Sequence, residues 1–448
     1  MKNQNTSGAG GGGIASLPQE IILKIQCYLN GKEASRTSVL GKSWYSAWCT
    51  RPHLDFNQCD FRSCNSDAFS EFTKKTLQRY EDRNLNIESF TLLMETEFFK
   101  DEPHCHNPSL AMELTVRALK LGPSHFEILP WNQNFVLPKE LFESETLASL
   151  DASGCTIDLE EVTCSQLIFL HLRAVIVKGD ARVKDTLFSL DLSSKFPYLK
   201  DLALWNCHGY KDIRICSPSL ERISLMGFKM FTAEFDVPNI RNFLFKGSVL
   251  SCLTFENTRW EWESDVRIIC DQFSAAWFTS LNRLVKRLSQ SKVSLSISMI
   301  FPPNWERCDC VEGLPVAVVE SLTLLDHMPN MLKSRKLPPN FLNALFMICR
   351  PKLMIQSWFP RNAWKDHNYL LKFVCKRLVA KLGGHRNGNG NFCFVPNPRM
   401  VGLKEVTAEI FEERVGEWRE LPWTTLLDAF AYPGEEREVR FRLKWEGL

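Results

Sequence analysis

The sequence lacks an excess of charge of either sign, a long apolar run and a dense set of cysteine pairs. Lysine and arginine total 54 against 52 aspartate and glutamate residues, so no bulk field would hold the chain on nucleic acid or an anionic membrane. There is no run of about 18 apolar residues that could span a bilayer, and the glycine-rich start lacks the apolar segment of a signal sequence. These absences predict a protein of the cytoplasm or nucleus with no nucleic-acid or membrane partner.

The 16 cysteines are scattered through long hydrophobic segments, which predicts reduced, mostly buried thiols. The nearest candidates for metal ligands are the His-Cys-His triplet at 104–106 and the Cys-Asp-Cys triplet at 308–310. Structural zinc pairs are usually separated by roughly two to four residues and occur twice, whereas each of these has one intervening residue. We therefore predict no metal, no cofactor and no catalytic residues, with a zinc site and a Cys–His nucleophile as the alternatives.

Residues 1–15 are rich in Gly, Asn and Ser, and they are predicted to form a disordered tail because they cannot bury enough apolar surface. Three short helical patterns follow within residues 16–56. Ser16 is a candidate N-cap with Pro18 in the first turn, and Trp44 and Trp48 share one face of the third pattern. The apolar stripe of the first pattern consists of Leu17, Ile21, Ile25 and Leu29. The small size of this module predicts that it docks on a partner, because its own core is too small for independent stability.

From about residue 87 a short strand motif of the form Leu-x-x-Leu-x-Leu recurs. Copies begin at residues 126, 147, 167, 199, 220 and 240, so the steps are 21, 20, 32, 21 and 20 residues, and a further copy begins at 319. Apart from the step of 32, which leaves room for an extra element, these steps fit leucine-rich repeats. The pattern predicts an α/β protein in which stacked repeats form a solenoid with a parallel concave sheet, ending in irregular capping repeats.

Strand side chains alternate between the core and the exposed sheet face, so the repeat register assigns each residue to one side. The residues predicted to point inward are Leu150, Leu170, Leu172, Leu202 and Leu204. The residues predicted to lie on the concave face are Asp151, His171, Arg173, Trp205, Arg222 and Met226. Trp, Arg and Met are enriched at protein interfaces, which makes this face a candidate recognition surface. The alternative is that a loop covers Trp205, so that its indole extends the core.

Residues 17–21, 38–48 and 51–56, read together, closely resemble an F-box. Four later segments, residues 137–142, 145–150, 196–202 and 441–445, resemble the plant F-box/LRR-repeat proteins. The resemblance implies the substrate receptor of a Skp–cullin–F-box (SCF) ubiquitin ligase, without an active site of its own. Its F-box would bind a Skp-type adaptor, and through it a cullin, while the repeats would bind a client protein. The alternative is an interaction scaffold that binds an adaptor without serving a ligase.

The resemblance also implies a division of the chain and a set of adaptor contacts. The expected parts are the disordered tail at 1–15, the F-box at 16–56, a helical linker at 57–86, and a leucine-rich-repeat domain with an irregular C-terminal cap at 87–448. The residues expected to contact the adaptor are Leu17, Pro18, Ile21, Ile25, Leu29, Val39, Leu40, Trp44 and Trp48. The six concave-face residues become candidate client contacts.

Overall fold

The computed structural model describes most of the chain from residue 17 onward. The described residues are 17–61, 66–94, 108–130, 134–159, 162–178, 188–208, 212–228, 232–248, 252–259, 261–305, 314–326, 337, 341–358, 369–381, 395–396, 402–412, 415–420 and 437–447. The expected tail at 1–15 and the triplets at 104–106 and 308–310 lie outside them. The chain forms two compact units, Met1–Lys184 with Leu192–Gly209, and Asp185–Asp191 with Tyr210–Leu448.

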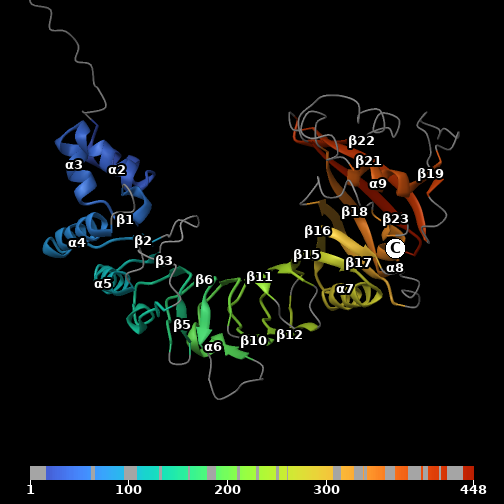
Figure 1. Ribbon diagram of the computed structural model, residues 1–448, viewed down its shortest axis with the longest axis horizontal. Helices are drawn as coiled ribbons and strands as arrows, with labels where there is room; N and C mark the ends of the chain where they lie inside the picture. The colour runs from blue at the N-terminus through green and yellow to red at the C-terminus, as the bar shows by residue number, and fades with distance from the viewer. Residues whose placement is uncertain are drawn as a thin grey trace, which may run out of the picture. The chain divides into compact units, whose positions relative to one another are not determined.

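The first unit begins with a helical module, drawn in blue in Figure 1. Its elements are α1 (Gln19–Cys27), α2 (Gly31–Thr37), the 3-10 turn η2 (Ser38–Leu40) and α3 (Lys42–Cys49). A capping box begins α2: the Asn30 side chain accepts a hydrogen bond from the Glu33 amide, and the Glu33 carboxylate accepts one from the Asn30 amide. Ile22, Trp44 and Ala47 form the buried core of the module. The predicted N-terminal helical region is confirmed.

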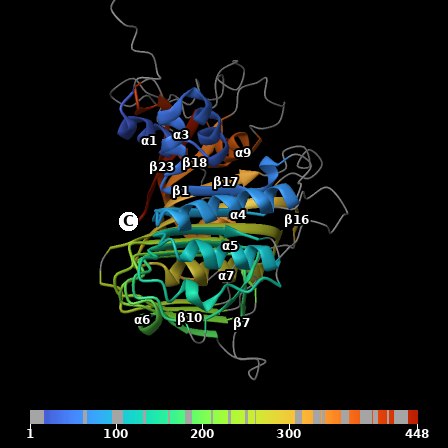
Figure 2. The same cartoon turned by 90° about the vertical axis from the view of Figure 1, so that its left-hand side faces the viewer.

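A parallel sheet makes up the rest of the first unit. Its strands, in spatial order, are β1 (His53–Asn57), β2 (Ser89–Leu93), β3 (His125–Leu129), β4 (Ser149–Ser153), β6 (Phe169–Arg173) and β9 (Asp201–Trp205). Two helices connect the first three strands, α4 (Ser66–Asp82) and α5 (Pro108–Leu119), and Figure 2 shows them side by side. The smaller elements are η3 (Gln58–Asp60), η5 (Lys139–Leu141), α6 (Leu192–Lys195), and the parallel pair β5 (Thr156–Asp158) and β7 (Ile176–Lys178).

The inward side of this sheet is an apolar ladder in which residues of neighbouring strands lie directly opposite one another. One row runs through Leu54, Phe90, Phe126, Leu150, Leu170 and Leu202. The next row runs through Phe56, Leu92, Ile128, Ala152, Leu172 and Leu204. Every residue of both rows is buried, which confirms the predicted inward direction of the five leucines. Neighbouring strands therefore stabilise one another through stacked side chains.

The second unit contains two main sheets and one short antiparallel pair. The larger has six parallel strands, β11 (Arg222–Phe228), β13 (Asn242–Gly247), β15 (Glu263–Phe273), β16 (Lys292–Trp305), β17 (Ala317–Asp326) and β18 (Cys349–Trp358). The smaller sheet is parallel and consists of β8 (Phe188–Asp191), β10 (Asp212–Cys216), β12 (Thr232–Asp236) and β14 (Cys252–Glu256). The helices are α7 (Ala275–Arg287), α8 (Phe341–Ile348) and α9 (Tyr369–Leu378), and a further antiparallel pair is β19 (Val379–Lys381) and β20 (Val395–Pro396).

The larger sheet ends in an antiparallel layer, which no parallel repeat predicts. Beyond β18 come β23 (Arg437–Trp445), β21 (Leu403–Glu412) and β22 (Glu417–Glu420), each antiparallel to its neighbour. Cross-strand charge pairs fit this direction, because Glu409 of β21 binds both Arg440 and Arg442 of β23. With its large parallel sheet and N-terminal helices, the chain has the predicted α/β class.

Candidate protein-docking surfaces

The helical module exposes an unusual amount of apolar side-chain surface. Twelve large hydrophobic residues are exposed in the described part of the chain, and half of them lie between residues 21 and 45. Their exposed fractions are 45% for Ile21, 36% for Ile25, 82% for Tyr28, 86% for Val39, 50% for Leu40 and 55% for Tyr45. Clustered exposed apolar residues mark interaction surfaces, so this module is a candidate docking site for another protein.

The direction of this surface is fixed by how α1 packs on its neighbours. Ile22 lies in the module core, and the buried Gln26 side chain donates hydrogen bonds to Thr37 Oγ1 (2.8 Å) and to the Trp44 carbonyl oxygen (3.1 Å). These bonds link α1 to α2 and α3. Because the face of α1 with Ile22 and Gln26 is turned inward, the face with Ile21 and Ile25 is turned to solvent.

The nine residues predicted to contact an adaptor fall into three groups. The exposed ones are Pro18, Ile21, Ile25, Val39 and Leu40, and the half-buried ones are Leu17, Leu29 and Trp48. Trp44 is the exception: it is only 3% exposed, and its side chain belongs to the module core. Trp44 therefore stabilises the core of the module and does not lie on its surface. Tyr28 and Tyr45 are also exposed but were not among the predicted adaptor contacts, although Tyr28 follows Ile21 and Ile25 at helical spacing.

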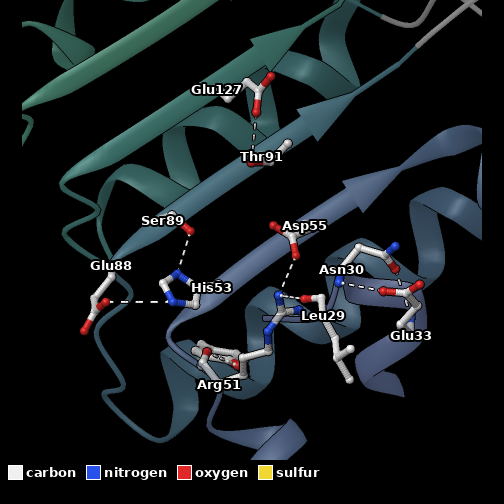
Figure 3. Close-up of polar contacts among 11 residues, drawn as sticks. Leu29, Asn30, Glu33, Arg51, His53, Asp55, Glu88, Ser89, Thr91 and Glu127 are labelled. Carbon is white, nitrogen blue, oxygen red and sulfur yellow. Dashed lines mark hydrogen bonds and ion pairs between the residues drawn. The ribbon is translucent and has the colours of Figure 1, made fainter. Parts of the chain in front are cut away.

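Arg51 holds this module against the sheet of the same unit, as Figure 3 shows. Its Nη2 donates to the Leu29 carbonyl oxygen (2.6 Å) and to Asp55 Oδ2 (2.7 Å), and its own carbonyl oxygen accepts from the Tyr80 hydroxyl (2.7 Å). Burial raises the pKa of Tyr80 to about 12, so this hydroxyl stays protonated and can donate. The Arg51 side chain is only 5% exposed, and the contacts of this residue join the segment after α1 to β1 and α4.

A second surface is the outward side of the parallel sheet in the first unit. Five polar residues lie opposite one another across consecutive strands: Asp55, Thr91, Glu127, Asp151 and His171. Figure 3 shows the first three on β1, β2 and β3, where the Thr91 hydroxyl donates to Glu127 Oε2 at 3.4 Å. We call this set the polar row. It places the carboxylates of Glu127 and Asp151 on neighbouring strands of one sheet face, with Asp55 two strands away from Glu127.

Four of the six predicted client contacts meet at one end of the polar row. Arg173 donates to Asp151 from Nε (3.3 Å to Oδ1) and Nη2 (2.7 Å to Oδ2), and its guanidinium carbon lies 5.7 Å from the ring centre of Trp205. His171 Nε2 lies 3.5 Å from Asp201 Oδ1. Trp205 is half-buried on the same face as Arg173. These side chains therefore form one polar and aromatic cluster.

The other two predicted client contacts belong to the second unit. Arg222 and Met226 both lie on β11, where Arg222 is exposed and Met226 is half-buried. They are four residues apart, so they share one side of that strand.

The ionised form of Glu127 is electrostatically unfavourable within the polar row. Burial and the Asp151 carboxylate raise its pKa, and Arg173 offsets this only in part. The folded chain therefore binds this proton more tightly than the unfolded chain does, and ionised Glu127 destabilises the fold at pH values above its raised pKa. This cost disappears as the pH falls below the ordinary carboxyl value, because the side chain is then protonated in both states.

A Glu127→Gln variant is consequently expected to melt at a higher temperature than the unaltered chain at about pH 7 and at the same temperature at about pH 3. Thermal denaturation across this range measures the difference. Glu140→Gln, at an exposed position in η5, is the control and should leave the melting temperature unchanged. A lower melting temperature for Glu127→Gln at about pH 7 would contradict the assignment.

Most cysteines in the described part of the chain are buried thiols. Ten cysteines of this part are free, seven of these are buried, and burial raises the pKa of Cys155 to about 12 and of Cys207 to about 11. Since the thiolate is the reactive form, these two thiols are unreactive. No group of three or more His, Cys, Asp or Glu side chains placed to hold a metal occurs within the described ranges. Among the helices described, none is long and apolar enough to cross a bilayer.

Comparison with known proteins identifies relatives of the chain. No family model matches it. It is 28% identical over 239 residues to an FBD-associated F-box protein of Arabidopsis thaliana, covering 51% of this chain and 54% of that protein. It is 26% identical over 259 residues to a putative F-box/FBD/LRR-repeat protein (54% and 55%) and 27% identical over 241 residues to an F-box/LRR-repeat protein (51% and 44%), both also from Arabidopsis thaliana.

The chain thus spans about half the length of these curated relatives. The similarities agree with the resemblance seen in the sequence, since the relatives' names combine the F-box and the leucine-rich repeat. The chain is a homologue of the plant F-box/LRR-repeat proteins.

Proposed function

We propose that the chain is the substrate-recognition subunit of an SCF-type ubiquitin ligase, without an active site of its own. The observation that carries the proposal is the exposed apolar face of the helical module, in a chain whose relatives are F-box proteins. Residues 16–56 would be a three-helix F-box that binds a Skp-type adaptor, and the adaptor would bring a cullin. The ligase would act in the cytoplasm or nucleus.

The rest of the chain would bind the client protein. Residues 57–86 would link the F-box to a leucine-rich-repeat domain at 87–448, an irregular solenoid whose C-terminal part serves as a cap. The stacked strands of the first unit and the inward apolar ladder support this reading, because repeat proteins bury their cores between neighbouring repeats. The outward sheet face, with the cluster around Arg173, is then available to a client protein.

Burial of the exposed apolar side chains supports a stable contact with the adaptor. Each fully buried Ile, Leu or Val side chain contributes about 1.5–3 kcal/mol before ordering costs. Ile21, Ile25, Val39 and Leu40 are already held by folded elements, so less ordering is needed on binding. The half-buried Leu17, Leu29 and Trp48 would line the edge of the same contact.

Affinity purification of the tagged full chain, expressed in plant cells, tests the proposal. We expect a Skp-type adaptor and a cullin to be recovered together, and the recovered complex to transfer ubiquitin to a bound protein when E1, E2 and ubiquitin are added. Recovery of the adaptor without a cullin would instead favour an interaction scaffold outside a ligase. Recovery of neither protein would contradict both readings.

The cluster around Arg173 carries a prediction about the client. Arg173→Ala with Trp205→Ala is expected to remove most client proteins detected by proximity labelling under proteasome inhibition, while adaptor recovery stays unchanged. The stability cost should be small, because the pair of Arg173 with Asp151 is partly exposed, and such pairs are worth about 0–1 kcal/mol.

Arg241→Ala, which alters an exposed arginine of the second unit, is the matched control for this client experiment. It should leave the labelled proteins unchanged. A large drop in melting temperature for Trp205→Ala alone would assign this indole to the core and remove it from the proposed client surface.

A further inference from the structure

A cavity of about 260 Å³ lies within the first unit, where the helical module meets β1 and α4. It shares Trp48 with the edge of the proposed adaptor contact, whereas the exposed Ile21, Ile25, Val39 and Leu40 are not among its lining residues. Its apolar walls are aromatic: Trp48 from α3, Phe56 from β1, Phe61, and Phe72 from α4. Phe72 meets Phe56 edge-on with ring centres 6.2 Å apart, and Phe61 lies 5.5 Å from Phe72. Walls of this kind accept a flat apolar body by stacking or edge contacts.

The charged groups that line the cavity leave one cation in excess. Lys32 is paired with Asp60 at 2.9 Å, and Arg51 is paired with Asp55 at 2.7 Å. The third cation, Arg79, has no carboxylate within ion-pair distance among the residues that the structure describes. The lining of the cavity therefore carries a net positive charge even without any contribution from His53, which also lines it.

The excess cation is held in a fixed position against aromatic rings. The guanidinium carbon of Arg79 lies 4.7 Å from the ring centre of Trp48 and 5.6 Å from that of Tyr80. Contacts of this kind attract a cation but do not neutralise it. Arg79 is thus placed at the wall of an aromatic cavity with its charge available to an anion.

Two buried donors at the same cavity make no hydrogen bond within the described chain. They are the Nε atoms of Arg51 and Arg79. Arg51 is nine-tenths buried or more, so solvent does not readily satisfy its Nε. A buried donor without an acceptor is costly, and an arginine donor is most strongly satisfied by an anionic oxygen. The cavity therefore combines unmet donors with an uncompensated positive charge.

We infer that this cavity binds a small organic anion with a flat apolar body, of the aromatic carboxylate class. The carboxylate pairs with Arg79, and the ring packs between Trp48 and Phe72. The volume is near the lower end for ligand pockets, which restricts the ligand to a small molecule. Because its walls come from both the helical module and α4, a bound ligand ties these elements together and raises the melting temperature by mass action.

Calorimetric titration of the full chain, without any adaptor, tests this inference independently of the proposed function. The probe is naphthalene-2-carboxylate, with naphthalene-2-carboxamide and inorganic phosphate as comparisons. We expect saturable binding of the carboxylate with a Kd below about 1 mM, and binding at least about tenfold weaker for the uncharged amide and for phosphate. Equal binding of the amide and the carboxylate, equal binding of phosphate, or no binding of the carboxylate would each overturn it.

Substitutions at the cavity test whether the carboxylate binds there. Arg79→Gln is expected to weaken carboxylate binding at least about tenfold. Lys75→Gln, on the exposed side of the same helix, is the matched control and should bind as the unaltered chain does. Since Arg79→Gln also changes the contact with Trp48, Ser35→Phe provides a second route: it fills the cavity from α2, leaves Arg79 in place, and should also prevent binding. Unchanged affinity in both Arg79→Gln and Ser35→Phe would place the ligand elsewhere and contradict the inference.

Discussion

A full chain that carries Ile21→Asp and Leu40→Asp is expected to lose at least about 99% of its affinity for a Skp-type adaptor. Each buried apolar side chain contributes about 1.5–3 kcal/mol, and the two aspartates would in addition bring charge into a desolvated contact. Both positions are about half exposed in the free chain, so the substitutions should leave the module folded. Binding of purified chain to immobilised adaptor measures the effect.

The control for this double variant introduces the same charge at exposed apolar positions elsewhere. Tyr198 and Val415 are each 63% exposed and lie outside the helical module. Tyr198→Asp with Val415→Asp should therefore bind the adaptor as the unaltered chain does. Adaptor affinity that is the same in both double variants would show that the exposed face of the module is not the contact.

The second large effect is expected inside the same module. Trp44→Ala should destabilise the helices α1 to α3 by about 3–5 kcal/mol, because it removes the largest side chain of their core and leaves a cavity. Native-state hydrogen exchange at the amides of α1 reports the local free energy of opening. Adaptor binding should fall together with this local stability.

Substitution of the neighbouring Tyr45 distinguishes the loss of a core side chain from the loss of a surface side chain. Tyr45 is 55% exposed on the same helix, so Tyr45→Ala should change the local free energy of opening by no more than about 0.5 kcal/mol. If Trp44→Ala left exchange in α1 as slow as in the unaltered chain, Trp44 would not be the core residue described above. Its indole would then return to the set of candidate adaptor contacts.

The different positions of Trp44 and Ile21 show what helical periodicity can predict. The spacing of apolar residues predicted the helices, but both faces of α1 carry isoleucine, so it did not decide which face is inward. The decision depends on Gln26, a polar residue that is buried because Thr37 and the Trp44 carbonyl oxygen accept its amide hydrogens. Hydrogen bonds between segments 11 and 18 residues apart are not visible in a local pattern.

The repeat motif was more informative, since it predicted both the strands and the inward leucines of the first unit. Strand alternation needs only local sequence, and the parallel stacking follows from the regular step. The antiparallel end of the second unit depends on β23 pairing with β18 across a wide sequence separation, which no repeat step encodes. The cavity beside Arg79 likewise arises from contacts among α2, α3, β1 and α4 and has no sequence motif.

The central claim is that the helical module is the part of the chain that binds a Skp-type adaptor. Hydrogen–deuterium exchange of the full chain, recorded with and without purified adaptor, tests it most directly. The account predicts slower exchange on adaptor binding in peptides covering α1, η2 and α3, and unchanged exchange in β6 and β9, where the cluster around Arg173 lies. Protection confined to the sheet strands, with exchange in α1, η2 and α3 unaltered, would contradict it.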